Sequence, residues 1–246
     1  MKNTTDRGSA RIGVIVPVSN SNLEPDMQMM KPAGVSIHSM RAGGYDLDEI
    51  PDSEQMRQFA ETSLESVLDA LCAVRPDAVI YGCTSATLSF GPDYDQTFRQ
   101  RMETRSGVSA ITAAGALVEA LRDLNIDSAS FASPYTETLN REGAEFVRQS
   151  GIDVVQLQYV GEDLGNYGQG ELTPSAVLQL GLQANNDRAA AVILSCTDMR
   201  AVEVVDDLET QIDKPVVTSN QALMYVACKR LGLRGNVPGR LGTLLN

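Results

Sequence analysis

Two stretches of the chain, Ala78-Val-Ile-Tyr-Gly-Cys-Thr84 and Ala191-Val-Ile-Leu-Ser-Cys-Thr197, share one pattern. Each is a short apolar run that ends in a small residue, a cysteine and a threonine. A continuous apolar run of this length, bounded by turn residues, is typical of a strand buried on both faces of a parallel sheet. The repetition therefore predicts two copies of one unit, each with a cysteine at the end of a strand.

Two further pairs of segments support the repeat. Ala110–Thr112 and Val216–Thr218 are each followed by an apolar helical pattern, and Ile12–Pro17 resembles Ser128–Pro134, since each runs into a loop with proline. The paired cysteines and the paired threonines are separated by similar lengths of chain. Two copies of one unit imply a pseudo-twofold arrangement with a single cleft between them.

Short apolar runs alternate with longer helical patterns, which is typical of an α/β protein with parallel sheets. The predicted strands are Ile12–Val16, Val35–Met40, Ala78–Tyr81, Ala110–Thr112, Ser128–Ala132, Val154–Tyr159, Ala190–Leu194 and Val216–Thr218. The predicted helices are Ser53–Val74, Asp93–Thr104, Ala114–Leu124, Glu137–Gln149, Pro174–Asn186, Ala201–Gln211 and Gln221–Leu231. We expect two pseudo-symmetric Rossmann-like lobes, each a mainly parallel sheet flanked by helices, with the active site in the cleft between them. Residues 1–112 plus 219–246 form lobe one in this prediction, and residues 113–218 form lobe two.

Composition narrows the range of partners. The net charge of −12 disfavours nucleic acid and anionic membrane surfaces as partners. Residues 1–10 are polar, so we expect no signal peptide and a cytoplasmic protein. The four cysteines, at 72, 83, 196 and 228, include no close pair and are expected to be free thiols. His38 is the only histidine, so a His-based triad or a multi-histidine zinc site is hard to build, and we predict neither metal nor cofactor.

Cys83 and Cys196 are the strongest candidates for chemistry. Each follows a strand and precedes polar residues: Cys83 precedes Thr84-Ser85, which suit the start of a helix, and Cys196 precedes Thr197-Asp198. Backbone N–H groups at a helix start lower the pKa of a thiol and also bind carboxylates. The alternative is that both are small buried apolar residues. That alternative is favoured for Cys72 and Cys228, which lie in apolar helical stretches, and His38 is expected to be structural or exposed.

Polar loop residues complete the predicted site. Asn20 follows the first strand, Tyr135 follows the equivalent strand of the second copy, and Asn166 lies in a glycine-rich loop after Val154–Tyr159. Each alone is compatible with an ordinary turn. Their shared position after strands favours a site, because ligands of open α/β sheets bind at the carboxyl ends of strands. No dinucleotide or P-loop glycine motif is present.

Taken together, these motifs resemble the aspartate/glutamate/hydantoin racemase superfamily, in the branch of maleate cis–trans isomerases and arylmalonate decarboxylases. The resemblance extends from about Arg11 to the C-terminus and rests on Val16-Pro-Val-Ser-Asn20, Gly82-Cys-Thr-Ser85, Ala113-Ala-Gly-Ala-Leu117, Ser133-Pro-Tyr135, Asn166 with Gly170-Glu-Leu-Thr-Pro174, Leu194-Ser-Cys-Thr197 and Pro215-Val-Val-Thr-Ser219. The turns Cys83-Thr-Ser85 and Cys196-Thr-Asp-Met-Arg200 depart from the usual maleate isomerase pattern.

The resemblance also implies roles for residues. Cys83 and Cys196 match the paired catalytic cysteines. Positions that hold substrate carboxylates in maleate isomerases match Asn20, Tyr135 and Asn166, and the carboxylate pocket of the decarboxylases matches Thr84, Ser85 and Tyr135. Thr197 is added to the predicted substrate site because it follows the second cysteine. Dimers are common in such families, so the resemblance implies a homodimer or a higher homo-oligomer.

These observations leave several reactions open. The leading prediction is cis–trans isomerisation of maleate or a similar dicarboxylate by thiolate addition, with Cys83 as nucleophile and Cys196 moving the proton. Racemisation next to a carboxylate, with one cysteine as base and the other as acid, is the second possibility. Decarboxylation of an arylmalonate is third, since those decarboxylases keep only the second cysteine. The non-enzyme alternative is a two-lobed protein that binds a small carboxylate.

Overall fold

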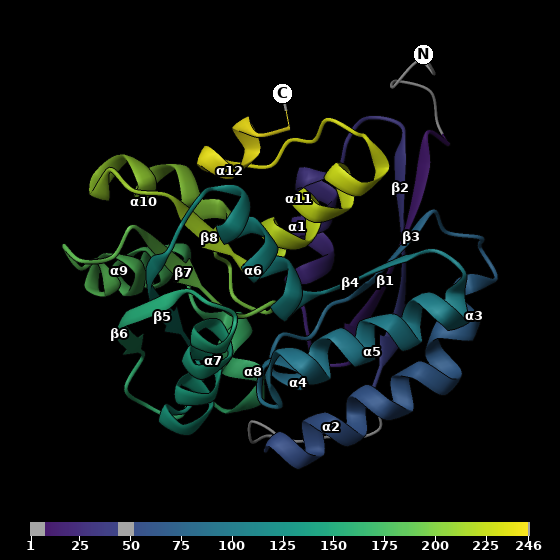
Figure 1. The fold of residues 1–246 in the computed structure, drawn as a ribbon, viewed down its shortest axis with the longest axis horizontal. Helices are drawn as coiled ribbons and strands as arrows, with labels where there is room; N and C mark the ends of the chain where they lie inside the picture. Colours follow the sequence, from purple (N-terminus) through teal and green to yellow (C-terminus); the bar gives the residue numbers. More distant parts are fainter. Residues whose placement is uncertain (1–7, 44–51, 246) are drawn as a thin grey trace.

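The chain folds into two parallel sheets of four strands each (Figure 1). The computed structural model describes residues 8–43 and 52–245. The first sheet has the order β2-β1-β3-β4 and consists of β1 (Ala10–Pro17), β2 (Val35–Ala42), β3 (Ala78–Tyr81) and β4 (Ser109–Thr112). The second has the corresponding order β6-β5-β7-β8 and consists of β5 (Ser128–Ser133), β6 (Asp153–Tyr159), β7 (Ala191–Leu194) and β8 (Val216–Thr218).

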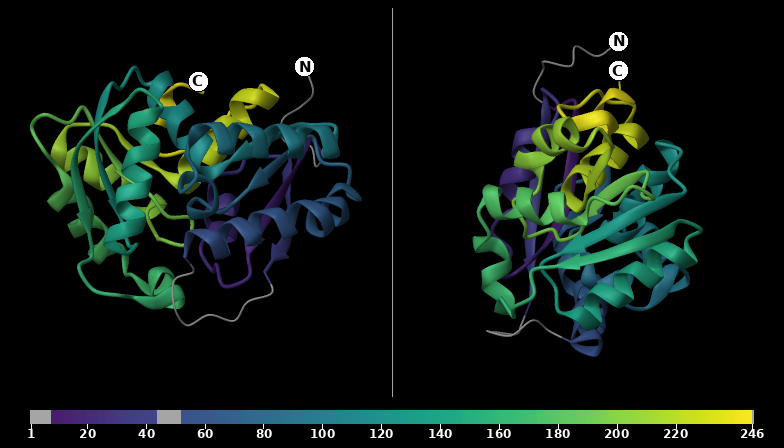
Figure 2. Two further views of the ribbon diagram at one scale, coloured as in Figure 1. Left: turned by 60° about the horizontal axis from the view of Figure 1, so that its bottom comes forward. Right: turned by 90° about the vertical axis from the view of Figure 1, so that its left-hand side faces the viewer.

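The matching strand orders confirm the repeat and the predicted fold class. All eight predicted strands are present, and every neighbouring pair is parallel. The two halves lie side by side, as Figure 2 shows. The division into residues 1–112 plus 219–246 and residues 113–218 stays a prediction.

Helices cover both sheets. They are α1 (Leu23–Met30), α2 (Ser53–Thr62), α3 (Leu68–Cys72), α4 (Ser85–Leu88), α5 (Gly91–Ser106), α6 (Ala113–Asp123), α7 (Glu137–Gln149), α8 (Gly165–Glu171), α9 (Pro174–Ala184), α10 (Val205–Ile212), α11 (Ser219–Leu231) and α12 (Gly239–Thr243). A π-helical turn, Ser63–Val67, interrupts the predicted helix Ser53–Val74, and a 3₁₀ turn, Val202–Val204, precedes α10. Three helices, α1, α8 and α12, were not predicted.

The paired threonines fix the starts of equivalent helices. The Thr112 hydroxyl accepts a hydrogen bond of 3.2 Å from Gly115 N at the start of α6. At the start of α11, Thr218 accepts 3.1 Å from Gln221 N, and the Gln221 side chain accepts 3.0 Å from Thr218 N. This reciprocal pair is a capping box, which satisfies two N–H groups that a helix start leaves free.

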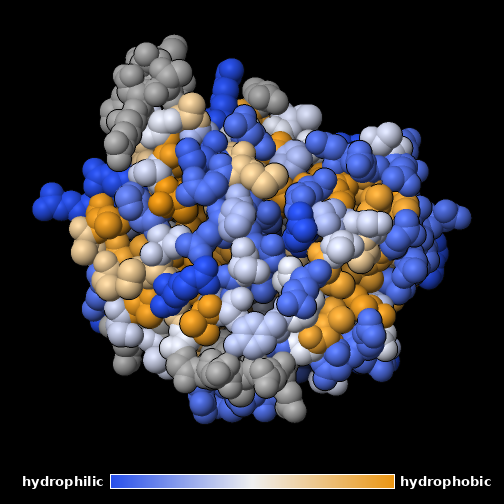
Figure 3. All heavy atoms as spheres, turned by 180° about the vertical axis from the view of Figure 1, so that it is seen from behind, coloured by the Kyte–Doolittle hydropathy of each residue, from blue (hydrophilic) through white to orange (hydrophobic). Residues whose placement is uncertain are grey.

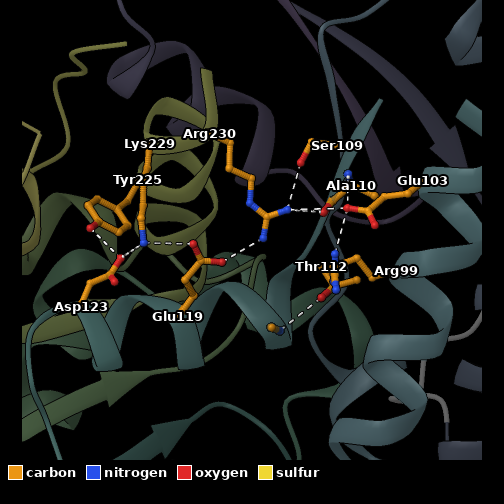
Figure 4. A network of polar contacts seen from close by, with 11 residues as sticks. Arg99, Glu103, Ser109, Ala110, Thr112, Glu119, Asp123, Tyr225, Lys229 and Arg230 are labelled. Atoms are coloured by element: carbon orange, nitrogen blue, oxygen red, sulfur yellow. Dashed lines mark hydrogen bonds and ion pairs between the residues drawn. The ribbon is translucent and has the colours of Figure 1, made fainter. Parts of the chain in front are cut away.

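Polar contacts on the surface of α11 connect it to α6 and β4 (Figure 4). Arg230 donates to Glu119 at 2.9 Å and to the Ala110 carbonyl at 2.9 Å. Asp123 pairs with Lys229 and accepts 2.8 Å from Tyr225 Oη. Each exposed ion pair contributes at most about 1 kcal/mol, so the apolar packing beneath them holds the helices together.

The apolar core runs through both halves. One buried cluster includes Val14 of β1, Leu117 of α6, Phe131 of β5 and Met224 of α11. Large exposed apolar side chains are scattered, at Val18, Met29, Tyr167 and Leu244. On the face shown in Figure 3, hydrophilic residues interrupt the hydrophobic ones. Across the described part of the chain, no helix is both long enough and apolar enough to cross a membrane.

Candidate active site

One small cavity lies where the carboxyl ends of the two sheets meet. It offers about 40 Å³ of space to a water molecule. Its lining comes from the end of β1, from the turns that follow β1, β3, β5 and β7, and from α2, α4 and α8. It consists of Pro17, Ser19, Asn20, Met56, Cys83, Thr84, Ser85, Tyr135, Asn166, Gln169, Cys196, Thr197 and Asp198. All eight residues predicted for the site are in this set. Their chemical roles stay predictions.

Cys83 lies at the turn between β3 and α4, as predicted. Its sulfur is 3.6 Å from Ser85 Oγ and accepts hydrogen bonds from the backbone N–H groups of Ser85 and Ala86. The Thr84 hydroxyl donates a hydrogen bond of 3.1 Å to Ser219 Oγ at the start of α11. The turn therefore offers N–H and O–H donors beside a thiol.

Cys196 lies in a different kind of turn. Thr197 and Asp198 lie in a turn, and the predicted helix Ala201–Gln211 is present as the 3₁₀ turn Val202–Val204 followed by α10. The Cys196 thiol donates 3.3 Å to Gln169 Oε1 and accepts 3.3 Å from Asp198 N. Side chains and a single N–H, not a helix start, surround this sulfur.

The prediction that the turns lower the thiol pKa values is wrong. Burial raises the pKa of Cys83, and hydrogen bonds from Ser85 and Ala86 offset only part of that rise. Burial, followed by the charge of Asp198, raises the pKa of Cys196 to about 12. The sequence shows where a helix begins, but not how completely the sulfur is removed from water, and here removal from water is the larger effect.

Tyr135 lies between the two cysteine turns. It is 5% exposed, and its hydroxyl hydrogen-bonds to Cys196 and to Thr84. Burial raises its pKa well above the ordinary value, so it is a neutral O–H donor. Asn140 holds this loop in place: its amide donates 3.0 Å to the Tyr135 carbonyl, and its Oδ1 accepts 2.9 Å from Ser133 Oγ.

Asn20 connects the two halves across the cavity. Its Oδ1 accepts 2.9 Å from Leu23 N and so caps α1. Its amide donates 3.1 Å to Thr197 Oγ1, and that hydroxyl donates 2.9 Å to the Gly82 carbonyl beside Cys83. One chain of hydrogen bonds thus connects the turns after β1, β7 and β3.

Asn166 lies on α8, one turn before Gln169. Its amide donates 3.0 Å to Ser19 Oγ in the loop after β1. Gln169 was missed by the sequence interpretation, although its spacing of three residues from Asn166 would place both on one face of a helix. Predicting α8 as a helix would have found it.

Cys72, Cys228 and His38 lie outside the cavity. Cys228 is fully buried in α11, as predicted, whereas Cys72 is only partly buried at the end of α3. His38 lies in β2, and its Nε2 is 2.9 Å from Ser36 Oγ. Within residues 8–43 and 52–245, no group of three or more His, Cys, Asp or Glu side chains is placed to hold a metal ion.

Comparison with known proteins agrees with this architecture. A family model described as arylmalonate decarboxylase matches residues 12–245. The chain belongs to this family. Among curated members it is similar to maleate isomerase from Geobacillus stearothermophilus, at 26% identity over 96% of this chain and 97% of that one. Maleate isomerase from Alcaligenes faecalis is 28% identical over 93% of each chain.

Solved structures of the arylmalonate decarboxylase family share the fold. Maleate isomerase from Pseudomonas putida S16 with maleate gives a TM-score of 0.85 at 22% identity, covering 95% of this chain and 97% of that one. A mutant of Nocardia farcinica maleate cis–trans isomerase with a covalently bound succinylcysteine intermediate gives 0.84 at 22% identity, covering 95% and 98%. These comparisons confirm the predicted branch of maleate isomerases and arylmalonate decarboxylases.

Proposed function

We propose that this protein is an isomerase that converts maleate, or a similar small cis-dicarboxylate, to its trans form. The observation that carries the proposal is that two buried thiols, Cys83 and Cys196, line one small polar cavity. Similarity to maleate isomerases over nearly the whole chain supports the reaction type. Thiol addition and proton transfer need no cofactor.

In the first step the Cys83 thiolate adds to one carbon of the double bond. A C–S bond forms, and the π electrons move to the second carbon and its carboxylate. The Cys196 thiol then gives its proton to that carbon and becomes a thiolate. The product is a succinyl group on Cys83, in which the former double bond is single and rotates freely.

The second half reverses these transfers. The Cys196 thiolate removes the proton, the C–S bond breaks, and the trans dicarboxylate leaves. Cys83 returns to the thiolate and Cys196 to the thiol, so one negative charge passes from Cys83 to the substrate, to Cys196 and back, and the cycle needs no net change in protonation.

Their surroundings support different roles for the two thiols. The backbone N–H groups of Ser85 and Ala86 lower the pKa of Cys83 and so favour its anion, although burial raises that pKa overall. The neighbouring Asp198 charge disfavours an anion at Cys196. Cys83 is therefore the better nucleophile and Cys196 the better proton donor.

Neutral donors around the cavity hold the carboxylates in this proposal. Asn20 and Asn166 supply amides, and Ser85 and Tyr135 supply hydroxyls. Thr84 and Thr197 belong to the same proposed site, but they donate their hydroxyl protons to Ser219 Oγ and to the Gly82 carbonyl and so hold the turns that carry the other donors. Aimed at the carboxylate that gains charge during addition, such donors stabilise the transition state.

The size of the cavity favours an aliphatic substrate over an aryl one. A volume of about 40 Å³ accommodates only a few water molecules. The lining combines polar groups with apolar surface from Pro17, Met56 and the Tyr135 ring, so the preference rests on the volume of the cavity. Racemisation is the second candidate, because one thiol would act as acid and the other as base on a small carboxylic acid.

We also propose that the protein forms a dimer.

The test is proton NMR of the protein with maleate in deuterated water. Production of fumarate supports the proposal, and its absence from folded, reduced protein contradicts it. Exchange of an α-hydrogen in a panel of chiral acids, without fumarate, indicates racemisation instead. Mass spectrometry of the Cys196→Ser variant checks the roles: the adduct with the mass of maleic acid belongs on the peptide that contains Cys83.

A further inference from the structure

Asp198 joins the second cysteine turn to the loop after β1. Its Oδ1 accepts 2.8 Å from Ser21 N, 3.1 Å from Asn22 N and 3.0 Å from Asn22 Nδ2. Its own backbone N–H donates 3.3 Å to the sulfur of Cys196. One buried residue thus contacts the thiol through its backbone and the opposite half of the molecule through its side chain.

Asn22 extends this contact to a third segment. Its amide donates 3.0 Å to the Asp198 carbonyl and 3.1 Å to the Gly170 carbonyl at the end of α8. A Cβ on Gly170 would lie 2.9 Å from Asp198 Oδ2 and 3.0 Å from Ser21 Oγ. An alanine at position 170 would therefore press on the Asp198 carboxylate and the Ser21 hydroxyl, and these side chains would have to shift to accommodate it.

We propose that Asp198 is a positioning residue for Cys196, which fixes the cysteine turn against the loop after β1 and places a negative charge beside the sulfur. The proposal rests on the isomerase function above, in which Cys196 has to be protonated when the substrate binds so that it can donate its proton. A carboxylate that accepts several hydrogen bonds is fixed in direction, and the turn that carries it is fixed with it.

Asp198 differs from the other titratable groups around Cys196 in carrying a fixed charge next to the sulfur. Tyr135 and Cys83 face the sulfur from the other turns, and both are neutral when protonated. Asp26 on α1 lies beyond Asp198 and is connected to this turn through Asn220, whose amide donates 2.7 Å to Asp26 and 3.0 Å to the Thr197 carbonyl. Glu203 and Arg200 act on Asp26 with opposite signs. Asp198 is therefore the nearest fixed charge to this thiol.

The first experiment measures iodoacetamide alkylation of each cysteine from pH 7 to pH 11, by peptide mapping of the full chain. In Asp198→Asn, loss of the charge is expected to speed alkylation of Cys196 about tenfold at pH 9 and to shift its pH profile downward. Cys83 is the internal standard, and its profile should move less. The matched control is Asp207→Asn, which removes the same charge from an exposed site on α10.

The second experiment separates position from charge. Gly170→Ala keeps every charge but displaces the Asp198 carboxylate from its hydrogen-bonded position, and kcat for maleate is expected to fall about 10- to 100-fold. Its Cys196 alkylation profile should keep the midpoint of the unchanged protein. Gly168→Ala, on the same helix, meets Leu164 Cβ at 3.2 Å and is expected to stay within about twofold.

Identical Cys196 profiles in Asp198→Asn and Asp207→Asn would overturn the proposal, as would full activity of Gly170→Ala. If Asp198→Asn does not fold, the Gly170→Ala and Gly168→Ala pair decides, with kcat for maleate as its readout: a fall in Gly170→Ala alone, at an unchanged Cys196 alkylation midpoint, supports the proposal, and equal kcat values in the two variants overturn it. Failure of the unchanged protein to form fumarate contradicts the isomerase function instead. In that case the alkylation profiles still show whether Asp198 controls the thiol.

Discussion

Asn20 and Thr197 follow strands of different sheets and are joined by a hydrogen bond of 3.1 Å from the asparagine amide to the threonine hydroxyl. Both residues are buried, at 3% and 4% exposure. The Asn20 side chain thus does two jobs, because its oxygen caps α1 while its amide serves the cavity. A substitution that changes only the Asn20 amide nitrogen separates the role at the start of α1 from the role in the cavity.

Asn20→Asp is that substitution. It keeps the oxygen that caps α1, and a carboxylate is also favourable at a helix start. It removes the amide donor and adds a negative charge where a substrate carboxylate would bind. We expect KM for maleate to rise about 10- to 100-fold and Tm to fall, because the new carboxylate is buried without a positively charged partner, checked by steady-state kinetics and thermal unfolding. An unchanged KM would remove Asn20 from the substrate site.

The rate should rise with pH. Burial raises the pKa of Cys83 above its ordinary value of 9.0, so the nucleophilic thiolate forms only in alkaline solution. Cys196, with a pKa of about 12, stays a proton donor through that range. We therefore expect kcat/KM to increase about tenfold per pH unit from pH 7 to pH 9. A decline of kcat/KM between pH 8 and pH 10, in protein that stays folded, would contradict the roles assigned to Cys83 and Cys196.

Folding stability should respond to pH through Asp26. Burial raises its pKa from 3.8 to about 7, so the folded state favours the protonated form, and stability falls as pH rises through this window. Between pH 5 and pH 8 the loss from this group is about 2 to 3 kcal/mol. Asp26→Asn should show a correspondingly smaller loss in urea unfolding.

The control for Asp26→Asn is Asp207→Asn, which should keep the full pH dependence. Burial also raises the pKa of Asp95, to about 6. Asp95 is present in both variants, so it changes the pH dependence of their unfolding free energies equally. Equal pH dependence in the two variants would show that Asp26 titrates normally.

The strands were predictable because each is a local apolar run. Helix α1 was not, because Pro25 lies within its first turn, and α8 was not, because glycines occupy three of its seven positions. The contact of Asp198 with Ser21 joins residues that are far apart in sequence, so no local pattern contains it. Burial of the sulfurs depends on the same long-range packing, which explains why the positions of the cysteines were predicted but their pKa directions were not.

We expect Met56 to limit the size of the substrate. Its side chain is 5% exposed, lines the cavity, and accepts 3.5 Å from Ser85 Oγ beside Cys83. Met56→Ala removes three heavy atoms from the lining, so we expect the ratio of kcat/KM for 2-methylmaleate to that for maleate to rise at least about tenfold, at a stability cost of about 2 to 4 kcal/mol. Met29→Ala, at a 56% exposed position, is the control and should leave this ratio unchanged. If folded Met56→Ala shows the original ratio, other residues set the size limit.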